Sequence, residues 1–219
     1  MIRLKNAYKY YRQGENIIKG LNNVSLEIAE HEFVSIMGPS GSGKSTVMNI
    51  LGCLDRLSEG EYYLDGIDAR RADERRLASL RSNYIGFVFQ SFNLIPRLTA
   101  RQNIELPLIY RGVDRSSRRK RADEMLERMR LVNRAEHLPN ELSGGQRQRV
   151  AIARALIGEP RVILADEPTG SLDSITGKSI MSLFRELHEN GATIVLITHA
   201  KEVADYAGRI MYLSDGRLS

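Results

Sequence analysis

Four short apolar runs without charged residues place the tightest constraint on the fold of this 219-residue chain. They span residues 33–37 (FVSIM), 84–89 (YIGFVF), 162–165 (VILA) and 194–197 (IVLI). Because polar residues do not alternate with apolar ones, we expect strands buried on both faces, which is typical of a parallel sheet covered by helices. The sequence therefore predicts an α/β fold with a mostly parallel core sheet.

Polar residues follow each of these runs at once. They are the segment from Gly38 onward, then Gln90, Asp166 with Glu167, and Thr198 with His199. In open α/β sheets, ligands bind beyond the carboxyl ends of the strands. We therefore expect the four strand ends to contribute to one nucleotide pocket.

Two further regions have a different pattern. Residues 21–28 (LNNVSLEI) and 62–64 (YYL) are typical of half-exposed strands beside turns, which predicts a small N-terminal antiparallel sheet. From about residue 96 to 142 the pattern is helical, most clearly over 118–132, and we expect an inserted α-helical subdomain there. The whole chain, 1–219, is then interpreted as a single domain.

Composition narrows the function classes. No apolar run reaches the roughly 18 residues that span a bilayer, and the N-terminus lacks the apolar segment of a secretory signal, so we expect a cytoplasmic protein. Much of the net charge of +5 comes from residues 111–121 (RGVDRSSRRKR), interpreted as a solvated helix start. Without interleaved aromatic residues or a base-reading motif, this run does not indicate a nucleic-acid partner.

The segment Gly38–Ser45 reads GPSGSGKS and matches the phosphate-loop pattern, with a predicted strand before it and a predicted helix, 45–54, after it. Glycines let backbone N–H groups approach phosphate oxygens, and the helix N-terminus favours an anion. We expect Lys44 to contact the β- and γ-phosphates and the Ser45 hydroxyl to bind Mg²⁺.

Downstream of the third apolar run, Asp166 has the position of a Mg²⁺-binding carboxylate, and Glu167 can accept a proton from the attacking water. The pair could instead cap a helix, since Pro168 follows. That alternative would leave the phosphate loop without a partner on the metal side, so the functional interpretation is preferred.

Three further residues complete the predicted pocket. His199 follows a buried strand and is the expected contact of the γ-phosphate, while the Gln90 amide can touch Mg²⁺ or water and report the nucleotide state to the helical insertion. One ring among Tyr8, Tyr10 and Tyr11 could stack on adenine. Spacing alone does not choose among the three.

A second glycine-containing helix start follows at Ser143, Gly144 and Gly145, within NELSGGQRQRVAIARAL. Its N-terminus also presents open N–H groups, but it has no lysine and no Mg²⁺-binding hydroxyl at the right spacing. It can assist in holding a nucleotide, and it cannot hold one alone.

Taken together, LSGGQ (142–146), GPSGSGKST (38–46), Gln90, VILADEP and His199 occur in an order that resembles the ATP-binding subunit of an ABC (ATP-binding cassette) transporter. The resemblance implies a cassette that binds ATP and Mg²⁺, hydrolyses ATP, and pairs head to tail with a second copy so that each LSGGQ closes over the partner's ATP. It implies that Tyr11 stacks on adenine and that residues 171–173 (SLD) cross the dimer interface. The implied nucleotide contacts are Tyr11, Gly38, Pro39, Ser40, Gly41, Ser42, Gly43, Lys44, Ser45, Thr46, Ser143, Gly144, Gly145, Gln146 and Asp173. The implied metal ligands are Ser45, Gln90 and Asp166, and the implied catalytic residues are Glu167, His199 and Gln90.

More narrowly, residues 51–56 (LGCLDR), 86–108 and 165–174 (ADEPTGSLDS) resemble the branch that serves macrolide and peptide exporters and lipoprotein-releasing systems. This implies a membrane permease partner and a position on the inner face of the cell membrane. Ser171 stands where that branch often has Asn or Ala, and we expect no change of chemistry from it. DNA-repair machines with a similar signature need a long heptad insertion that this chain lacks, and the presence of Glu167 and His199 argues against a module that only holds ATP.

Overall fold

We analysed a computed structural model of the chain, which describes residues 1–14 and 16–219. The chain divides into two compact units. Unit 1 comprises residues 1–81 and 188–219, and unit 2 comprises residues 82–187. Each is described by itself below. The prediction of one domain over 1–219 with an inserted helical subdomain at about 96–142 stays a prediction.

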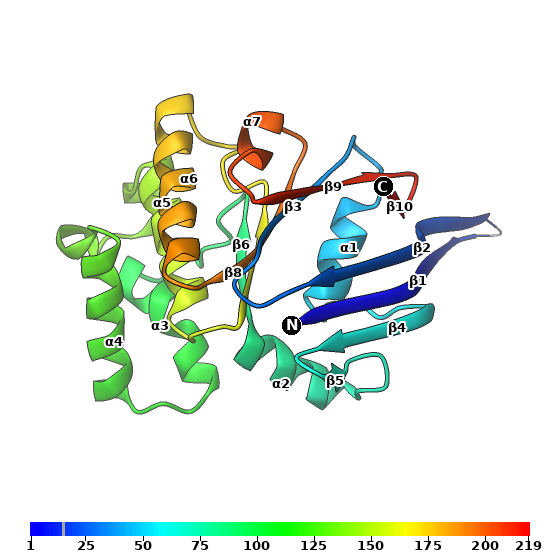
Figure 1. Cartoon of the computed structure of the whole chain (residues 1–219). Coiled ribbons are helices and arrows are strands. Elements are labelled where there is room, and N and C mark those ends of the chain that lie inside the picture. Colours follow the sequence, from blue (N-terminus) through cyan, green and yellow to red (C-terminus); the bar gives the residue numbers. More distant parts are fainter. Residues whose placement is uncertain (15) are drawn as a thin grey trace. The chain divides into compact units, whose positions relative to one another are not determined.

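Unit 1 contains an antiparallel sheet with the strand order β2-β1-β4-β5 (Figure 1). Its strands are β1 (Ile2–Gln13), β2 (Asn16–Ile28), β4 (Glu59–Leu64) and β5 (Ile67–Asp68). At the start of β1, buried Ile2 and Leu4 alternate with exposed Arg3 and Lys5, which is the pattern of a sheet with one face in the core. The predicted N-terminal antiparallel sheet is confirmed.

The second group of strands in unit 1 carries the phosphate loop. It comprises β3 (Phe33–Met37), β8 (Thr193–Thr198), β9 (Arg209–Ser214) and β10 (Arg217–Leu218). Strand β3 pairs in parallel with β8 on one side and β9 on the other, and β10 returns antiparallel to β9. All residues of β3 and β8 are buried. This agrees with the uninterrupted apolar runs from which these strands were predicted.

The helices of unit 1 are α1 (Lys44–Leu51), α7 (Lys201–Ala204) and most of α2 (Glu74–Tyr84). Helix α1 ends earlier than the predicted 45–54, because the chain turns at Gly52 and Cys53 takes a left-handed conformation with φ of 53°. Tyr84 closes α2 and does not begin the next strand as predicted. Cys53 is buried, and burial raises the pKa of its thiol, which makes the thiol less reactive.

Unit 2 has two parallel strands, β6 (Ile85–Phe89) and β7 (Val162–Asp166), which pair from Ile85 with Val162 to Phe89 with Asp166. Its helices are α3 (Ala100–Tyr110), α4 (Arg115–Arg128), α5 (Gly144–Leu156) and most of α6 (Ser174–Glu189), with two short 3₁₀ turns, η1 (Val132–Arg134) and η2 (Pro139–Glu141). The predicted α/β class with mostly parallel core strands is confirmed.

Helix α4 occupies a different range from the predicted 118–132. The Asp114 side chain accepts a hydrogen bond from the Ser117 backbone N–H at 3.0 Å, so the helix begins at Arg115. It ends at Arg128, and Arg130 beyond it has a positive φ of 58°. The helix therefore starts inside the basic run, which is compatible with the good helix propensity of arginine and lysine.

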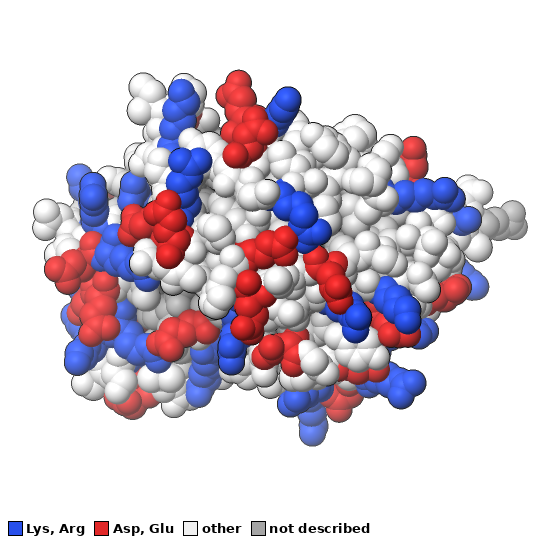
Figure 2. Space-filling model, viewed as in Figure 1, with Lys and Arg blue, Asp and Glu red and all other residues white. Residues whose placement is uncertain are grey.

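The basic run 111–121 is partly structural. Most of its residues are exposed, as expected for a solvated helix start. Arg111, however, donates to the Gly158 carbonyl at 2.6 Å, and Arg118 pairs with Glu105, whose side chain is 11% exposed. On the face drawn in Figure 2, Lys and Arg are interspersed with Asp and Glu. Internal ion pairing therefore accounts for part of the charge in this run.

Candidate nucleotide-binding site

The phosphate loop leaves β3 and opens α1 in unit 1. Gly43 is the N-cap of α1 with φ of 104°, a conformation that favours glycine, and a Cβ there would lie 2.4 Å from the Gly20 carbonyl oxygen. A Cβ on Gly38 would lie 2.2 Å from the Leu213 carbonyl oxygen. The glycines thus let the loop pack against strands β2 and β9. The sequence motif and the observed backbone agree.

The polar groups of the loop suit an anion. Lys44 Nζ donates to the carbonyl oxygens of Gly38 and Pro39, at 2.7 Å each, so the ammonium lies over the loop. Ser45 is exposed at the N-terminus of α1. The Ser42 hydroxyl is buried and has no hydrogen-bond partner among the described residues. A phosphate chain would supply acceptors to these donors and to the open N–H groups of the helix start.

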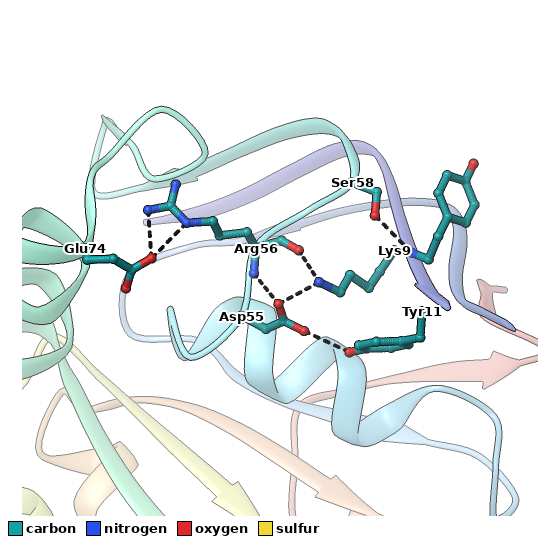
Figure 3. Close-up of polar contacts among 7 residues, drawn as sticks. Lys9, Tyr11, Asp55, Arg56, Ser58 and Glu74 are labelled. Atoms are coloured by element: carbon teal, nitrogen blue, oxygen red, sulfur yellow. Dashed lines mark hydrogen bonds and ion pairs between the residues drawn. The ribbon is translucent and has the colours of Figure 1, made fainter. Parts of the chain in front are cut away.

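Tyr11 lies close to the same helix (Figure 3). A Cβ built on Gly20 would be 2.8 Å from Tyr11 Cε2 and 2.9 Å from Thr46 Oγ1, so the ring and the Thr46 side chain both lie against Gly20. The Tyr11 hydroxyl donates to Asp55 Oδ2 at 2.9 Å. Burial, and to a lesser degree the Asp55 carboxylate, raise the pKa of Tyr11, so the hydroxyl stays protonated. The structure therefore places this tyrosine beside α1.

His199 follows the buried strand β8 directly, as the sequence predicts, and its side chain is exposed. The turn that carries it is held by Thr198, whose Oγ1 accepts a hydrogen bond from the Ala200 backbone N–H at 3.1 Å. Unit 1 thus contains the phosphate loop, Tyr11 and His199.

In unit 2, Gln90 follows β6 and lies next to the segment 170–171. The Ser171 hydroxyl donates to the Gln90 carbonyl oxygen at 2.9 Å. A Cβ on Gly170 would be 2.7 Å from the Gln90 side-chain nitrogen. Ser171, interpreted from the sequence as a neutral change, therefore makes a specific contact with the loop that carries Gln90.

The predicted acidic pair lies at the end of β7. Asp166 is the last residue of the strand and is in register with Phe89, which precedes Gln90. Glu167 is half-buried and has a left-handed φ of 44°, a conformation that costs a non-glycine residue of the order of 1–2 kcal/mol. Such strain concentrates at functional sites. The alternative of a helix cap is wrong, because the next helix, α6, begins only at Ser174.

The second glycine motif begins α5, as predicted. Ser143 and Gln146 form a capping box: Ser143 Oγ accepts from the Gln146 backbone N–H at 3.3 Å, and Gln146 Oε1 accepts from the Ser143 N–H at 2.9 Å. A Cβ on Gly145 would be 2.5 Å from Thr176 Cγ2, and one on Gly144 would be 3.0 Å from a Leu172 methyl group. The signature and the SLD segment are therefore in contact within unit 2.

Asp173 of the SLD segment is the start signal of α6. Its Oδ1 accepts hydrogen bonds from the backbone N–H groups of Ile175 and Thr176, at 3.1 and 2.9 Å. Hydrogen bonds from Thr176 are the largest cause of a pKa for Asp173 below its ordinary value. The carboxylate is exposed, so the cap leaves it accessible at the surface.

Helix α5 also contacts two other predicted site segments. Gln148, fully buried, donates to the Pro168 carbonyl oxygen at 2.7 Å, directly after Glu167. Arg154 donates to the carbonyl oxygens of Phe92 and Asn93, at 2.8 and 2.6 Å, in the loop after Gln90. Sequence reasoning missed both residues. Their partners lie 20 and 61 residues away in the sequence, so no local pattern pointed to these contacts.

The predicted site residues thus form two groups, each within one unit. Asp166, Glu167, Gln90, the signature 143–146 and Asp173 belong to unit 2. In the described part of the chain, no cluster of three or more His, Cys, Asp or Glu residues is arranged to hold a metal ion. The proposed ligands Ser45, Gln90 and Asp166 supply oxygen atoms, which Mg²⁺ prefers, together with substrate phosphates.

A search of the helices in the described residues identified none with both the length and the apolar character required to cross a bilayer. The strand–glycine loop–helix unit on parallel strands, with a lysine over the loop and an acidic pair at a strand end, defines a P-loop nucleotide-binding α/β protein.

Comparison with known proteins gives the family. The family model described as "ABC transporter" matches residues 21–170. MJ0796, an ABC transporter ATP-binding protein of Methanocaldococcus jannaschii, is 58% identical over 223 residues, covering all of this chain and 95% of that protein. The macrolide export ATP-binding/permease protein MacB of Brucella melitensis is 50% identical over 218 residues, covering all of this chain and 34% of MacB.

Among solved structures, the dimeric post-hydrolysis state of the MJ0796 cassette, bound to ADP and Pi, has a TM-score of 0.92 and 54% identity. The match covers all of this chain and 97% of that one. The chain therefore belongs to the ABC transporter family, and it is an ATP-binding protein of the ATPase type. The resemblance inferred from the motifs is confirmed.

Proposed function

We propose that this chain is the motor subunit of a transporter, in which two copies close head to tail around two ATP molecules and hydrolysis reopens them. The observation that carries the proposal is the pair of helix starts in one chain: α1 with Lys44 over its loop, and α5 with a capped glycine start and no lysine. A helix start that can touch phosphate but cannot hold it alone suits a nucleotide held by another copy. The structure of MJ0796, which is dimeric and bound to ADP and Pi, supports pairing of two copies and hydrolysis of ATP.

The chain's own residues have separate tasks in this proposal. The phosphate loop and Lys44 bind and orient the triphosphate, and Tyr11 stacks on adenine. Glu167 accepts the proton of the attacking water, and His199 contacts the γ-phosphate. Ser45, Gln90 and Asp166 would hold Mg²⁺, which when bound neutralises charge on the β- and γ-phosphates. Ser143, Gly144, Gly145 and Gln146 would contact the partner's nucleotide, and Asp173 would lie at the shared interface.

ATP can close the dimer only because it binds the closed state better than the open one. In a two-fold arrangement, each copy contributes one phosphate loop and one signature helix, so both sites form or neither does. The contact of Gly144 and Gly145 with residues 172 and 176 supports a shared role for the signature and the SLD segment.

Ser143 allows a test that separates catalysis in trans from binding in cis. Ser143→Asp keeps an N-cap-competent side chain but places a negative charge where the partner's γ-phosphate would lie. We expect it to abolish hydrolysis while ATP affinity at dilute, monomeric concentration stays nearly unchanged. Ser143→Thr keeps both the cap and the hydroxyl and should hydrolyse ATP at about the wild-type rate. A large loss of monomer affinity in Ser143→Asp would indicate that α5 acts on the chain's own nucleotide.

We further propose a membrane permease partner, a position at the cytoplasmic face of the membrane, and a role in export. The support is MacB, a protein named for macrolide export, of which this chain matches a third. Copurification from native membranes with a permease would support the assignment. Recovery of the chain only in the soluble fraction, with no membrane protein bound, would argue against it.

A further inference from the structure

The hydrogen bond between Tyr11 and Asp55 belongs to a closed polar cluster at the C-terminal side of α1 (Figure 3). Asp55 Oδ2 accepts from the Tyr11 hydroxyl at 2.9 Å, and Asp55 Oδ1 accepts from Lys9 Nζ at 2.6 Å and from the Arg56 backbone N–H at 2.7 Å. Lys9 Nζ also donates to the Arg56 carbonyl oxygen at 2.9 Å. The Asp55 carboxylate thus holds the strand residues Lys9 and Tyr11 and its own turn in one arrangement.

The cluster is well shielded and ionised. The Lys9 side chain is 13% exposed and that of Asp55 is 29% exposed. Burial acts to raise the pKa of Asp55, but the hydrogen bonds from Lys9, Arg56 and Tyr11 outweigh it, so the pKa lies below its ordinary value. Lys9 Nζ also lies 5.0 Å from the centroid of the Tyr11 ring, within the range of a cation–π contact. Hydrogen bonds to a charged acceptor are stronger than neutral ones, so the hydrogen bond to the Asp55 carboxylate holds the Tyr11 hydroxyl firmly in place.

Asp55 is itself anchored to α1. The backbone N–H groups of Leu54 and Asp55 both donate to the Asn49 carbonyl oxygen, at 2.8 and 3.1 Å. Helix α1 begins at Lys44 of the phosphate loop, so a single rigid element bears the phosphate-binding groups at one end and the anchor of the Tyr11 hydroxyl at the other. The distance between base-binding and phosphate-binding groups is therefore set by this helix.

We propose that Asp55 is a positioning residue for the purine base: it holds the Tyr11 ring in place for stacking before the nucleotide arrives, and Lys9 holds Asp55. The inference rests on the proposed role of Tyr11 on adenine. Gly20 and Thr46 lie beside the ring and limit its movement from that side, while Asp55 fixes its hydroxyl end. A ring ordered in advance binds a base more tightly, because less conformational entropy is lost on binding.

The test separates the base from the phosphates by comparing ATP with inorganic tripolyphosphate as ligands of the full chain. In Asp55→Ala, we expect ATP affinity to fall about three- to tenfold, the ordering cost of one immobilised side chain, while tripolyphosphate affinity stays at the wild-type value. Tyr11→Phe retains the ring but loses the hydroxyl, so it should show the same selective loss. The double variant should be no weaker than either single one, since both remove the same contact.

Glu74→Gln provides the matched control. Glu74 pairs with the Arg56 side chain at 3.0 Å and touches neither Tyr11 nor Asp55 in this cluster, so its loss should change neither affinity. Two results would overturn the proposal. Equal losses of affinity for ATP and tripolyphosphate in Asp55→Ala would show that Asp55 acts only on the helix. Unchanged ATP affinity in Tyr11→Phe would show that the hydroxyl contact does not position the ring. If Asp55→Ala fails to fold, Tyr11→Phe decides alone. Failure of the proposed stacking of Tyr11 on adenine is a different result: Tyr11→Ala, which removes the ring, would then bind ATP as tightly as the wild type.

Discussion

At the scale of single residues, the site depends on polar side chains that are held before a ligand binds. Lys44 lies over its own loop, Ser143 and Gln146 cap each other, and Asp55 fixes Tyr11. Such preorganisation means that binding energy is not consumed in ordering these groups. The segment at Glu167 is also held before a ligand binds. Glu167 has a left-handed backbone conformation, and Gln148 donates a hydrogen bond to the carbonyl oxygen of Pro168, the next residue.

The lowered pKa of Asp55 predicts a pH-dependent contribution to stability. Because the folded-state pKa lies below the unfolded value, the contribution is present above the unfolded pKa and is lost as pH falls through the folded pKa. We expect Asp55→Asn to lower the free energy of unfolding by about 1–2 kcal/mol at pH 7, typical of a partly exposed charged hydrogen bond. The difference from wild type should shrink as the pH falls below about 4.

Urea unfolding of both proteins from pH 7 to pH 3 measures this difference. If the difference in free energy of unfolding between Asp55→Asn and wild type stayed constant or widened in acid, the ionised form of Asp55 would not be what stabilises the fold. Tyr11→Phe should show a smaller gap than Asp55→Asn, because the hydrogen bonds from Lys9 and Arg56 remain.

The sequence predicted the glycine loops, Lys44, Ser143 and the strand-end residues, because each has a local motif or follows an apolar run. It did not predict Asp55 or Gln148. Lys9 and Asp55 are 46 residues apart, and Gln148 is 20 residues from Pro168. Neither pair has a spacing rule, since the partnership depends on how β1 meets the end of α1, and α5 the end of β7.

At the scale of secondary structure elements, helix α5 links the predicted functional segments of unit 2. Its first turn contacts Leu172 and Thr176, Gln148 holds Pro168, and Arg154 holds the loop after Gln90. A displacement of α5 would therefore shift or strain the contacts with all three segments. If the signature contacts a partner's nucleotide, as proposed, α5 provides a physical route from that contact to the residues beside Glu167.

The contact between α5 and α6 predicts that one substitution lowers the free energy of unfolding and that a second one restores it. Gly145→Ala places a methyl group 2.5 Å from Thr176 Cγ2, and we expect a net loss of about 1–2 kcal/mol in unfolding free energy, because overpacking outweighs the helix propensity of alanine. Thr176→Ser removes that methyl group. The double variant should recover most of the stability in urea unfolding. If Gly145→Ala alone were as stable as the wild type, the starts of α5 and α6 would be able to move apart without a cost in free energy.

Element prediction succeeded where the burial pattern is simple. β3, β6, β7 and β8 were found from continuous apolar runs. Strand β1 was missed because register shifts between Leu4 and Tyr10 interrupt its alternation, and α2 was missed because only Leu77 and Leu80 on it are buried. In both cases tertiary packing determines the element, and the local pattern is weak.

At the scale of the whole molecule, the proposed dimer would give the signature helix start of unit 2 a nucleotide that is bound by the phosphate loop of another copy. Unit 1 has a phosphate loop with its lysine, and unit 2 has a capped signature helix start without a lysine. The family is confirmed by a match over residues 21–170 and by relatives that align over the full chain. The motifs sufficed to predict the family because each is a contiguous stretch of sequence, whereas the proposed export and the proposed permease would be properties of another protein.

Sedimentation of Glu167→Gln with ATP tests whether two copies of the chain close around ATP. Loss of the carboxylate should stop hydrolysis without weakening ATP binding, so that closed dimers accumulate. We expect a dimer with two bound ATP molecules in the presence of ATP, a monomer without nucleotide, and a monomer when Ser143→Asp is added. A Glu167→Gln protein that binds ATP and still sediments only as a monomer would contradict the proposed closure.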